Sequence, residues 1–172
     1  MSHYMNLIGQ NAKKASLEKI NTKVKNKILK KYASLLDKER NSIIIENTKD
    51  IKFALKKRLK NNLIDRLTIN HKKLDNIKDS INKIIKLKDP VDNTLEKWSR
   101  PNGLKIKRVS IPIGVIGVIY ESRPNVTSDI ASLCFKSGNA VILKGGSEAI
   151  NTNKILAKLF RRALKESKVS EN

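Results

Sequence analysis

The stretch Ile113-Gly-Val-Ile-Gly-Val-Ile-Tyr-Glu-Ser-Arg-Pro-Asn125 decides the fold class of this chain. Its residues 115–120 are apolar on both faces of a strand, which is typical of strands covered on both sides in a parallel sheet. Pro124 ends the following loop, and the apolar spacing of residues 126–136 predicts a helix. Gly138 is well placed to end that helix in the left-handed conformation that glycine tolerates.

A second strand and a second helix continue the pattern downstream. Residues 139–144 form a short apolar run that predicts a buried strand, and residues 148–165 have the apolar spacing of a helix. Ser147 is a suitable N-cap for this helix, because its hydroxyl can accept a hydrogen bond from a first-turn N–H. The order strand, helix, strand, helix predicts an α/β fold and corresponds to half of a doubly wound parallel sheet.

Upstream of this block the pattern changes twice. Leu104-Lys-Ile-Lys-Arg-Val-Ser-Ile111 alternates apolar and polar residues, which predicts a strand with one solvent-exposed face. Residues 5–88 instead carry apolar side chains at three- and four-residue spacing, which predicts amphipathic helices with lysines on their outer faces. The first of these apolar runs begins at Leu17.

Asparagines and a proline mark where the helical runs begin and end. Asn41 is a candidate N-cap of the second run, and Asn70 precedes the third. Asp89-Pro90 ends the third run, because the residue before proline is disfavoured in the helical region. We therefore expect a helical N-terminal segment, residues 1–88, followed by an α/β segment, residues 89–172, the two forming one incomplete structural unit.

The charge balance is strongly basic. The chain has 37 Lys and Arg against 16 Asp and Glu, a net charge of +21. Such an excess suits a polyanion partner such as nucleic acid. However, the basic residues are spread along amphipathic helices, and few aromatic side chains lie between them to stack on bases. We expect codon bias in an AT-rich genome rather than a nucleic-acid partner, and a basic polyanion-binding protein stays as an alternative.

The chain has one cysteine, Cys134, so no internal disulfide can form and a reducing compartment is expected. The first residues lack the apolar core of a secretory signal, and no apolar run approaches the roughly 20 residues that span a bilayer. We therefore expect a cytoplasmic protein with no membrane partner. His3 and His71 have no carboxylate or thiol at ligand spacing, so no metal site is expected.

Lys144-Gly145-Gly146-Ser147 lies where the second strand leads into the last helix. Backbone N–H groups and the helix dipole favour an anion at such a place, and Lys144 adds a charge that could pair with a phosphate. The glycines would let the backbone approach a ligand closely. The alternative is an ordinary tight turn beside a surface lysine.

Asn125 follows a proline at the exit of the first buried strand. Its amide would therefore lie at the carboxyl end of the sheet, where ligands bind, and could stabilise a developing oxyanion. The alternative is a cap for the helix at residues 126–136. Cys134 lies on or beside the apolar face of that helix with no neighbouring base, which indicates a structural thiol.

Two strings together closely resemble the glutamate-5-semialdehyde dehydrogenases, also called gamma-glutamyl phosphate reductases, of the aldehyde dehydrogenase superfamily. They are Ile111-Pro-Ile-Gly-Val-Ile-Gly-Val-Ile-Tyr-Glu-Ser-Arg-Pro-Asn-Val-Thr127 and Lys136-Ser-Gly-Asn-Ala-Val-Ile-Leu-Lys-Gly-Gly-Ser-Glu-Ala149. Leu63-Ile-Asp-Arg-Leu67 and Asp89-Pro90 extend the resemblance upstream. The resemblance implies that residues 89–172 are part of a Rossmann-like NADP-binding domain of the aldehyde dehydrogenase type.

The resemblance also implies a reaction. This family reduces gamma-glutamyl phosphate with NADPH to glutamate-5-semialdehyde in proline biosynthesis, through a cysteine thioester that accepts the hydride. By resemblance, Asn125 would be the side-chain donor to the oxyanion. Lys144, Ser147 and Glu148, with Gly145 and Gly146 beside them, would hold the adenosine ribose and its 2′-phosphate.

Family members are more than twice as long, and their nucleophilic cysteine lies far downstream of the matched strings. Cys134 is therefore not its counterpart. The resemblance implies the N-terminal, cofactor-side part of such an enzyme, inactive alone. Two alternatives remain. One is half of a split enzyme, which would bind gamma-glutamyl phosphate only with a complementary C-terminal chain. The other is the basic polyanion-binding protein.

Overall fold

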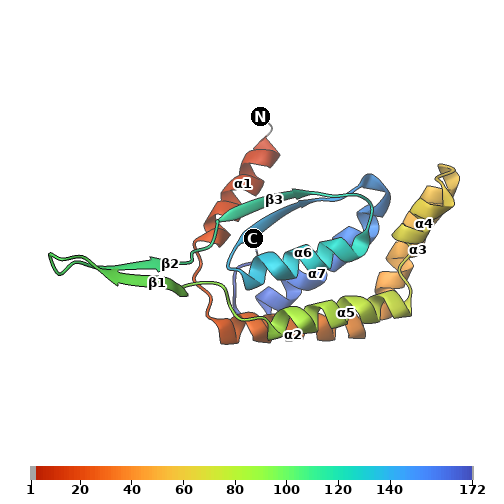
Figure 1. The fold of residues 1–172 in the computed structure, drawn as a ribbon. Helices are drawn as coiled ribbons and strands as arrows, with labels where there is room; N and C mark the ends of the chain where they lie inside the picture. Colours follow the sequence, from red (N-terminus) through yellow and green to blue (C-terminus); the bar gives the residue numbers. More distant parts are fainter. Residues whose placement is uncertain (1–2, 172) are drawn as a thin grey trace.

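The computed structural model describes residues 3–171 and confirms the predicted α/β class. Helices pack beneath a short parallel sheet, and a two-stranded hairpin projects from one end of the molecule (Figure 1). The elements are α1 (His3–Ser16), α2 (Thr22–Lys38), α3 (Arg40–Lys56), α4 (Asn61–Leu67), α5 (His71–Lys86), β1 (Thr94–Ser99), β2 (Lys105–Val109), β3 (Val115–Ile119), α6 (Pro124–Lys136), β4 (Ala140–Lys144), the 3₁₀ turn η1 (Ser147–Ala149) and α7 (Ile150–Lys165).

Side-chain caps define the starts of two N-terminal helices. Asn21 accepts a hydrogen bond from the Val24 N–H at the start of α2, and Asn70 accepts one from the Lys73 N–H at the start of α5. The predicted cap at Asn41 is wrong, because α3 begins one residue earlier and Asn41 lies inside it. The first apolar run also begins too early, since Leu17 is 69% exposed in the connection between α1 and α2.

One apolar core joins α2 and α5 to α6 and α7. Tyr32 of α2 is fully buried at its centre, and its ring meets that of Phe160 edge to face at 4.8 Å. The Tyr32 hydroxyl forms a 2.6 Å hydrogen bond with Ser128 Oγ, so the polar end of this large side chain is also satisfied. The helical segment and the α/β segment thus share one core. Its fully buried members include Ile28, Leu29, Leu36, Ile43, Leu74, Ile81 and Leu156.

Buried charges lie where α2, α5 and α6 meet. Lys25 forms an ion pair with Asp89 at 3.0 Å, and the Lys136 ammonium donates to Asn26 Oδ1 and to the Ile85 carbonyl. Burial lowers the pKa of Lys136. Burial alone would raise the pKa of Asp89, but hydrogen bonds from Val91, Thr22 and Lys25 outweigh it and hold this pKa below its ordinary value.

β3 and β4 pair in parallel, as predicted, with Val115 opposite Ala140 and Ile119 opposite Lys144. Helix α6 connects the two strands, and Gly138 ends it at φ +73°, as the sequence predicts. A Cβ on Gly138 would also lie 3.0 Å from the Pro112 side chain. The expected burial of both faces is wrong at Ile119, whose side chain is 80% exposed in this two-stranded sheet.

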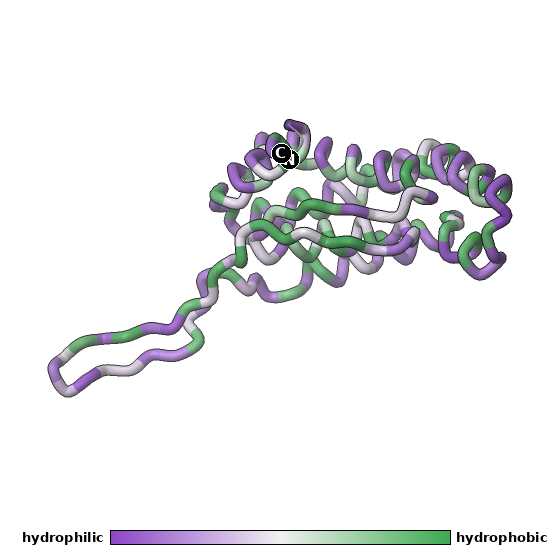
Figure 2. The backbone as a smooth tube through the Cα atoms, turned by 90° about the horizontal axis from the view of Figure 1, so that it is seen from above, coloured by the Kyte–Doolittle hydropathy of each residue, from purple (hydrophilic) through white to green (hydrophobic). Residues whose placement is uncertain are grey.

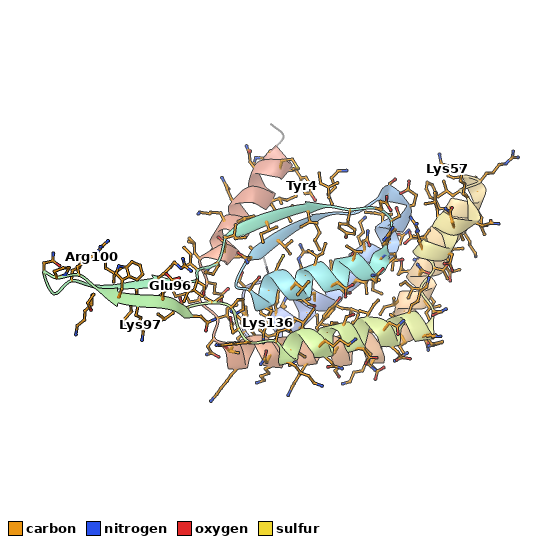
Figure 3. The ribbon with its side chains drawn as sticks, in the orientation of Figure 1. Tyr4, Lys57, Glu96, Lys97, Arg100 and Lys136 are labelled. Carbon is orange, nitrogen blue, oxygen red and sulfur yellow. The ribbon has the colours of Figure 1, made fainter. Side chains whose placement is uncertain are left out.

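The β1–β2 hairpin extends away from the body of the molecule (Figure 2). Its side chains point outward on both sides (Figure 3). The strand predicted at residues 104–111 is present as β2, in antiparallel register with β1. The prediction that only one of its faces meets solvent is wrong, because four of its five residues are exposed. In the two-stranded sheet of β1 and β2, the apolar side chain of Ile106 lies opposite Trp98, which accounts for an apolar residue at this position of the alternating sequence.

Candidate functional site

The two candidate segments meet at the carboxyl end of the parallel sheet. Because Ile119 and Lys144 are register partners, the loops that follow β3 and β4 leave the sheet side by side. The Tyr120 N–H donates to the Lys144 carbonyl at 3.1 Å and extends the pairing by one step. One loop leads to Asn125, and the other runs through Gly145 and Gly146 to η1. This end of a parallel sheet is where α/β folds bind ligands.

A hydrogen-bond chain fixes the first loop against α7. The Tyr120 hydroxyl lies 2.6 Å from Thr127 Oγ1, which in turn donates to Asn153 Oδ1 at 2.8 Å. Burial raises the pKa of Tyr120, so its hydroxyl stays protonated. A Cβ on Gly145 would lie 2.4 Å from Asn153 Nδ2. Sequence reasoning missed this chain, whose only signal is three polar residues close to the candidate strings.

A second hydrogen bond links the two loops directly. Ser122 Oγ donates to Glu148 Oε2 at 2.6 Å, and this bond contributes most to lowering the pKa of Glu148. A Cβ on Gly146 would lie 2.1 Å from Ser122 Oγ, so glycine is required here for the two loops to touch. The predicted capping by Ser147 is not observed, because its hydroxyl donates instead to Glu148 Oε1 at 3.2 Å.

Lys144 is exposed at the last position of β4. Within residues 3–171 its ammonium has no hydrogen-bond or ion-pair partner, whereas Glu148 nearby in the chain is an ionised carboxylate held by Ser122. Residues 144–148 therefore provide three groups in chain order: the cation of Lys144, which has no partner within residues 3–171, the N–H groups of a glycine turn, and the carboxylate of Glu148. These groups match the anionic and hydroxyl groups of a ribose phosphate.

The start of α7 does not provide the anion site that the sequence suggests. Asp50, a buried residue of α3, already occupies this helix start. Its Oδ1 accepts from the Asn151 N–H and side-chain amide, and its Oδ2 accepts from the Thr152 N–H and hydroxyl, at 2.6–3.1 Å. Because this carboxylate already complements the helix dipole, an anionic ligand would have to use Lys144 and the glycine turn instead.

Asn125 is the second residue of α6 and is exposed. The alternative reading of Asn125 as a helix cap does not hold, since Pro124 begins the helix and Arg123 is the capping residue. The Asn125 amide Nδ2 lies 3.3 Å from Asp129 Oδ2 one turn later. An amide nitrogen has two protons, so one remains available to an acceptor outside the helix.

Cys134 is a buried residue, and burial raises the pKa of its thiol. A thiol of this kind is a poor nucleophile, in agreement with the structural role expected from the sequence. Across residues 3–171 there is no group of three or more His, Cys, Asp or Glu side chains that could hold a metal ion. The same residues include no helix with the length and apolar character needed to cross a membrane.

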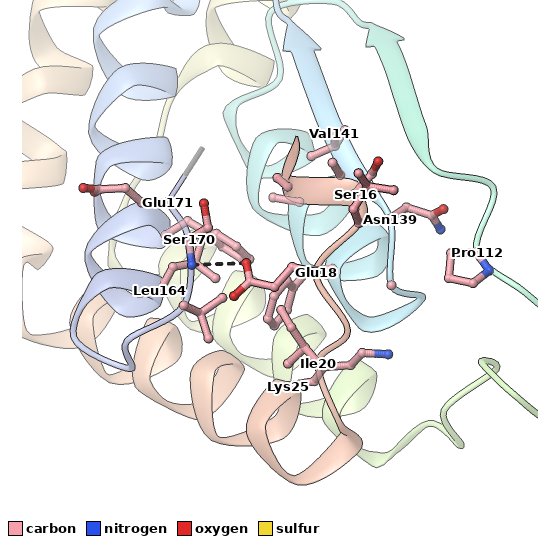
Figure 4. A pocket seen from close by; sticks show the side chains of 18 of the residues that line it. Ser16, Glu18, Ile20, Lys25, Pro112, Asn139, Val141, Leu164, Ser170 and Glu171 are labelled. Carbon is pink, nitrogen blue, oxygen red and sulfur yellow. Dashed lines mark hydrogen bonds between the residues drawn. The ribbon is translucent and has the colours of Figure 1, made fainter. Parts of the chain in front are cut away.

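A cavity of about 720 Å³ lies elsewhere. It is bounded by the α1–α2 connection, by residues 138–143 and by α7, and apolar side chains such as Ile20 and Leu164 dominate its wall (Figure 4). A smaller, polar cavity of about 390 Å³ contains Asn125. The candidate site at the carboxyl ends of β3 and β4 is therefore located by its charged and amide side chains, and not by the size of a cavity.

No family model matches this chain. Among curated proteins it is 46% identical over 167 residues to a gamma-glutamyl phosphate reductase of Clostridium botulinum, covering 96% of this chain and 40% of that protein. It is 51% identical over 150 residues to one of Hydrogenobaculum, covering 87% and 34% respectively. The chain thus spans about 40% of the length of the first relative.

Solved structures agree with these relatives. The gamma-glutamyl phosphate reductase of Thermotoga maritima matches 94% of this chain with a TM-score of 0.91 and 43% identity, over 40% of its own length. That of Saccharomyces cerevisiae matches 96% with a TM-score of 0.89 and 34% identity, over 42% of its length. A putative aldehyde dehydrogenase of Bacillus subtilis, at 21% identity and a TM-score of 0.64, shares the fold.

Proposed function

Because the chain belongs to the gamma-glutamyl phosphate reductase family over the length that it spans, we propose that it supplies the cofactor side and the oxyanion donor of a cytoplasmic, NADPH-dependent reduction of gamma-glutamyl phosphate to glutamate-5-semialdehyde. This reaction is a step of proline biosynthesis. The observation that carries the proposal is the position of Asn125, in the loop and helix after β3, and of Lys144, at the end of β4 and without a partner within residues 3–171, at one end of one sheet.

Each residue then has a chemical role. Asn125 donates its free amide proton to the oxygen that gains negative charge when the acyl carbon is attacked, and such donors are worth about 10²–10³ in rate. Lys144 pairs with the 2′-phosphate of the adenosine ribose, with Ser147 beside it, while Glu148 accepts from a ribose hydroxyl. The bound nicotinamide supplies the hydride. Gly145 and Gly146 leave room for the loop contacts that fix this turn.

The nucleophile comes from another part of the enzyme. Cys134, the only cysteine in the sequence, is buried within α6, and burial raises the pKa of its thiol. We therefore assign the thiolate to a complementary C-terminal segment, and gamma-glutamyl phosphate binds productively when both parts are together. This chain alone should not turn over substrate.

Cofactor binding gives the most direct test. NADPH titrated into the chain should bind more tightly than NADH, and Lys144→Met should weaken NADPH binding by about tenfold through loss of one phosphate pair. Lys57→Met, at the C-terminal end of α3, is the matched control and should leave the affinity unchanged. Equal binding of the two nucleotides, or an unaffected K144M variant, would remove the case for NADP.

Complementation tests the reaction itself. The chain is mixed with the C-terminal remainder of the Thermotoga maritima relative, and phosphate-dependent reduction of NADP⁺ by glutamate-5-semialdehyde is followed. The mixture should be active and the chain alone inactive. In the mixture, Asn125→Ala should lower kcat by about 10² or more. Turnover by the chain without its complement would contradict the assignment of the nucleophile.

A further inference from the structure

The carboxylate of Glu148 is held by a donor on each of its two oxygens. Ser122 Oγ donates to Oε2 at 2.6 Å, and Ser147 Oγ donates to Oε1 at 3.2 Å. Ser122 and Glu148 are half-buried, whereas Ser147 is exposed. The hydrogen bond from Ser122 is thus the shorter one and the better shielded from water, and it contributes most to lowering the pKa of Glu148.

The glycine turn and the loop after β3 fix this hydrogen bond in place. A Cβ on Gly146 would lie 2.1 Å from Ser122 Oγ and 2.9 Å from Glu148 Oε2, so both bonded oxygens lie against the bare backbone of the turn. The loop that carries Ser122 is anchored on both sides, because the Tyr120 N–H donates to the Lys144 carbonyl at 3.1 Å and α6 begins two residues after Ser122. Ser122 therefore holds the Glu148 carboxylate from a fixed position.

This hydrogen bond determines where the nearest acidic group in the turn lies relative to Lys144. Lys144 and Glu148 are four residues apart and carry opposite charges, yet within residues 3–171 no ion pair joins them. Without the hydroxyl of Ser122, the ionised carboxylate would be free to turn toward the ammonium, because opposite charges at close range attract. Such an ion pair would occupy the cation that a phosphate needs.

The two nicotinamide cofactors differ at the 2′ position of the adenosine ribose, where NADPH carries a phosphate and NADH a hydroxyl. The phosphate requires an unpaired cation, whereas the hydroxyl does not. Whether Lys144 is free therefore affects the affinity for NADPH and leaves the affinity for NADH unaltered. A residue that keeps Glu148 away from Lys144 favours NADPH.

We propose that Ser122 is a positioning residue for cofactor choice, which keeps Lys144 free for the 2′-phosphate of NADPH by holding the carboxylate of Glu148. This assignment rests on the proposed function, to which it adds a determinant of cofactor choice in the loop after β3. The determinant lies on the loop that leads to Asn125, and the phosphate-binding cation lies at the end of the neighbouring strand.

The test compares equilibrium binding of NADPH and NADH to the chain, followed by the fluorescence of the nucleotide. Ser122→Ala should weaken NADPH binding by about tenfold and leave NADH binding unchanged, so the ratio of the two affinities falls. Adding Glu148→Gln to this variant should restore the ratio, because an amide cannot neutralise Lys144. A ratio that S122A does not change, or an equal loss of both affinities, would overturn the proposal.

A matched control removes a hydrogen bond of the same kind at another place. Ser42 Oγ donates to Glu39 Oε2 at 3.0 Å at the start of α3, and Ser42→Ala should leave both affinities unchanged. If S122A fails to fold, Glu148→Gln in the chain that keeps Ser122 decides the matter. It should leave the ratio about unchanged, whereas a tenfold rise would mean that Glu148 pairs with Lys144 despite Ser122 and would overturn the proposal.

The same titrations separate this proposal from the proposed cofactor site. If the unaltered chain binds NADPH and NADH equally, the cofactor site fails and this proposal fails with it. If the unaltered chain prefers NADPH and S122A keeps that preference, the cofactor site stands and this proposal alone is rejected.

Discussion

Replacing Asp50 by Asn should destabilise the fold more than any other change of a single carboxylate in α3. Asp50 is 1% exposed, and its two oxygens accept four hydrogen bonds from the first residues of α7. The amide of Asn turns one oxygen into an NH₂ group that faces two donors of α7. Each buried donor left without an acceptor costs about 1–3 kcal/mol, so the free energy of unfolding should fall by about 3 kcal/mol.

Urea denaturation followed by circular dichroism measures this change. The midpoint should shift to lower urea with an unchanged slope, because the same surface is exposed on unfolding. Asp37→Asn is the control. Asp37 lies on the surface, paired with Arg40 and Lys78, and its substitution should move the midpoint only slightly. A D50N midpoint no lower than that of D37N would refute the reasoning that Asp50 holds the start of α7.

Three further changes follow from contacts in the fold. Because the pKa of Asp89 is lowered in the folded state, its ion pair with Lys25 adds stability at neutral pH, and this stability is lost as the pH falls through the lowered pKa. The difference in urea midpoint between the unaltered chain and the Asp89→Asn variant should therefore disappear on acidification. A difference that does not change with pH would contradict this. Gly146→Ala should lower the free energy of unfolding by about 1–2 kcal/mol, since the new Cβ overlaps Ser122 Oγ. In a double-mutant cycle, Ser122→Ala should reduce the destabilisation caused by Gly146→Ala. Gly9→Ala is the control, because nothing lies within 4 Å of a Cβ at that position. Cys134 should react with iodoacetamide about tenfold or more slowly in the folded chain than in urea, because burial raises the pKa of its thiol, and equal rates would show that it is accessible.

The features that the sequence predicts correctly are those that local patterns determine. The apolar runs at 115–120 and 139–144 favour burial, and the residues between them suit a helix. Because a helical connection joins neighbouring strands that run in the same direction, parallel pairing of β3 and β4 follows. The left-handed turn at Gly138 depends on glycine itself. The position of Asn125 beyond the carboxyl end of β3, in the first turn of α6, follows from the same topology.

The features that the sequence did not reveal depend on contacts between distant residues. Asp50 is one polar residue among many in a helical run, and nothing local indicates that its partners lie more than 100 residues downstream. Asp129 and Arg66 line the same cavity only because α4 and α5 pack beside α6. The exposure of Ile119 likewise reflects how many strands flank it, which its own sequence does not encode.

The contact between Asp50 and α7 has a consequence for how the protein is made. During synthesis α2, α3 and α5 leave the ribosome long before α7, yet the apolar faces of α2 and α5 are buried partly by residues of α7 such as Leu156 and Phe160. The nascent chain must therefore keep Asp50 hydrated and this apolar surface open until residues 150–165 emerge. The core shared by α2, α5 and α7 can therefore close only after residues 150–165 have been made, and until then the apolar faces of α2 and α5 are exposed on the nascent chain.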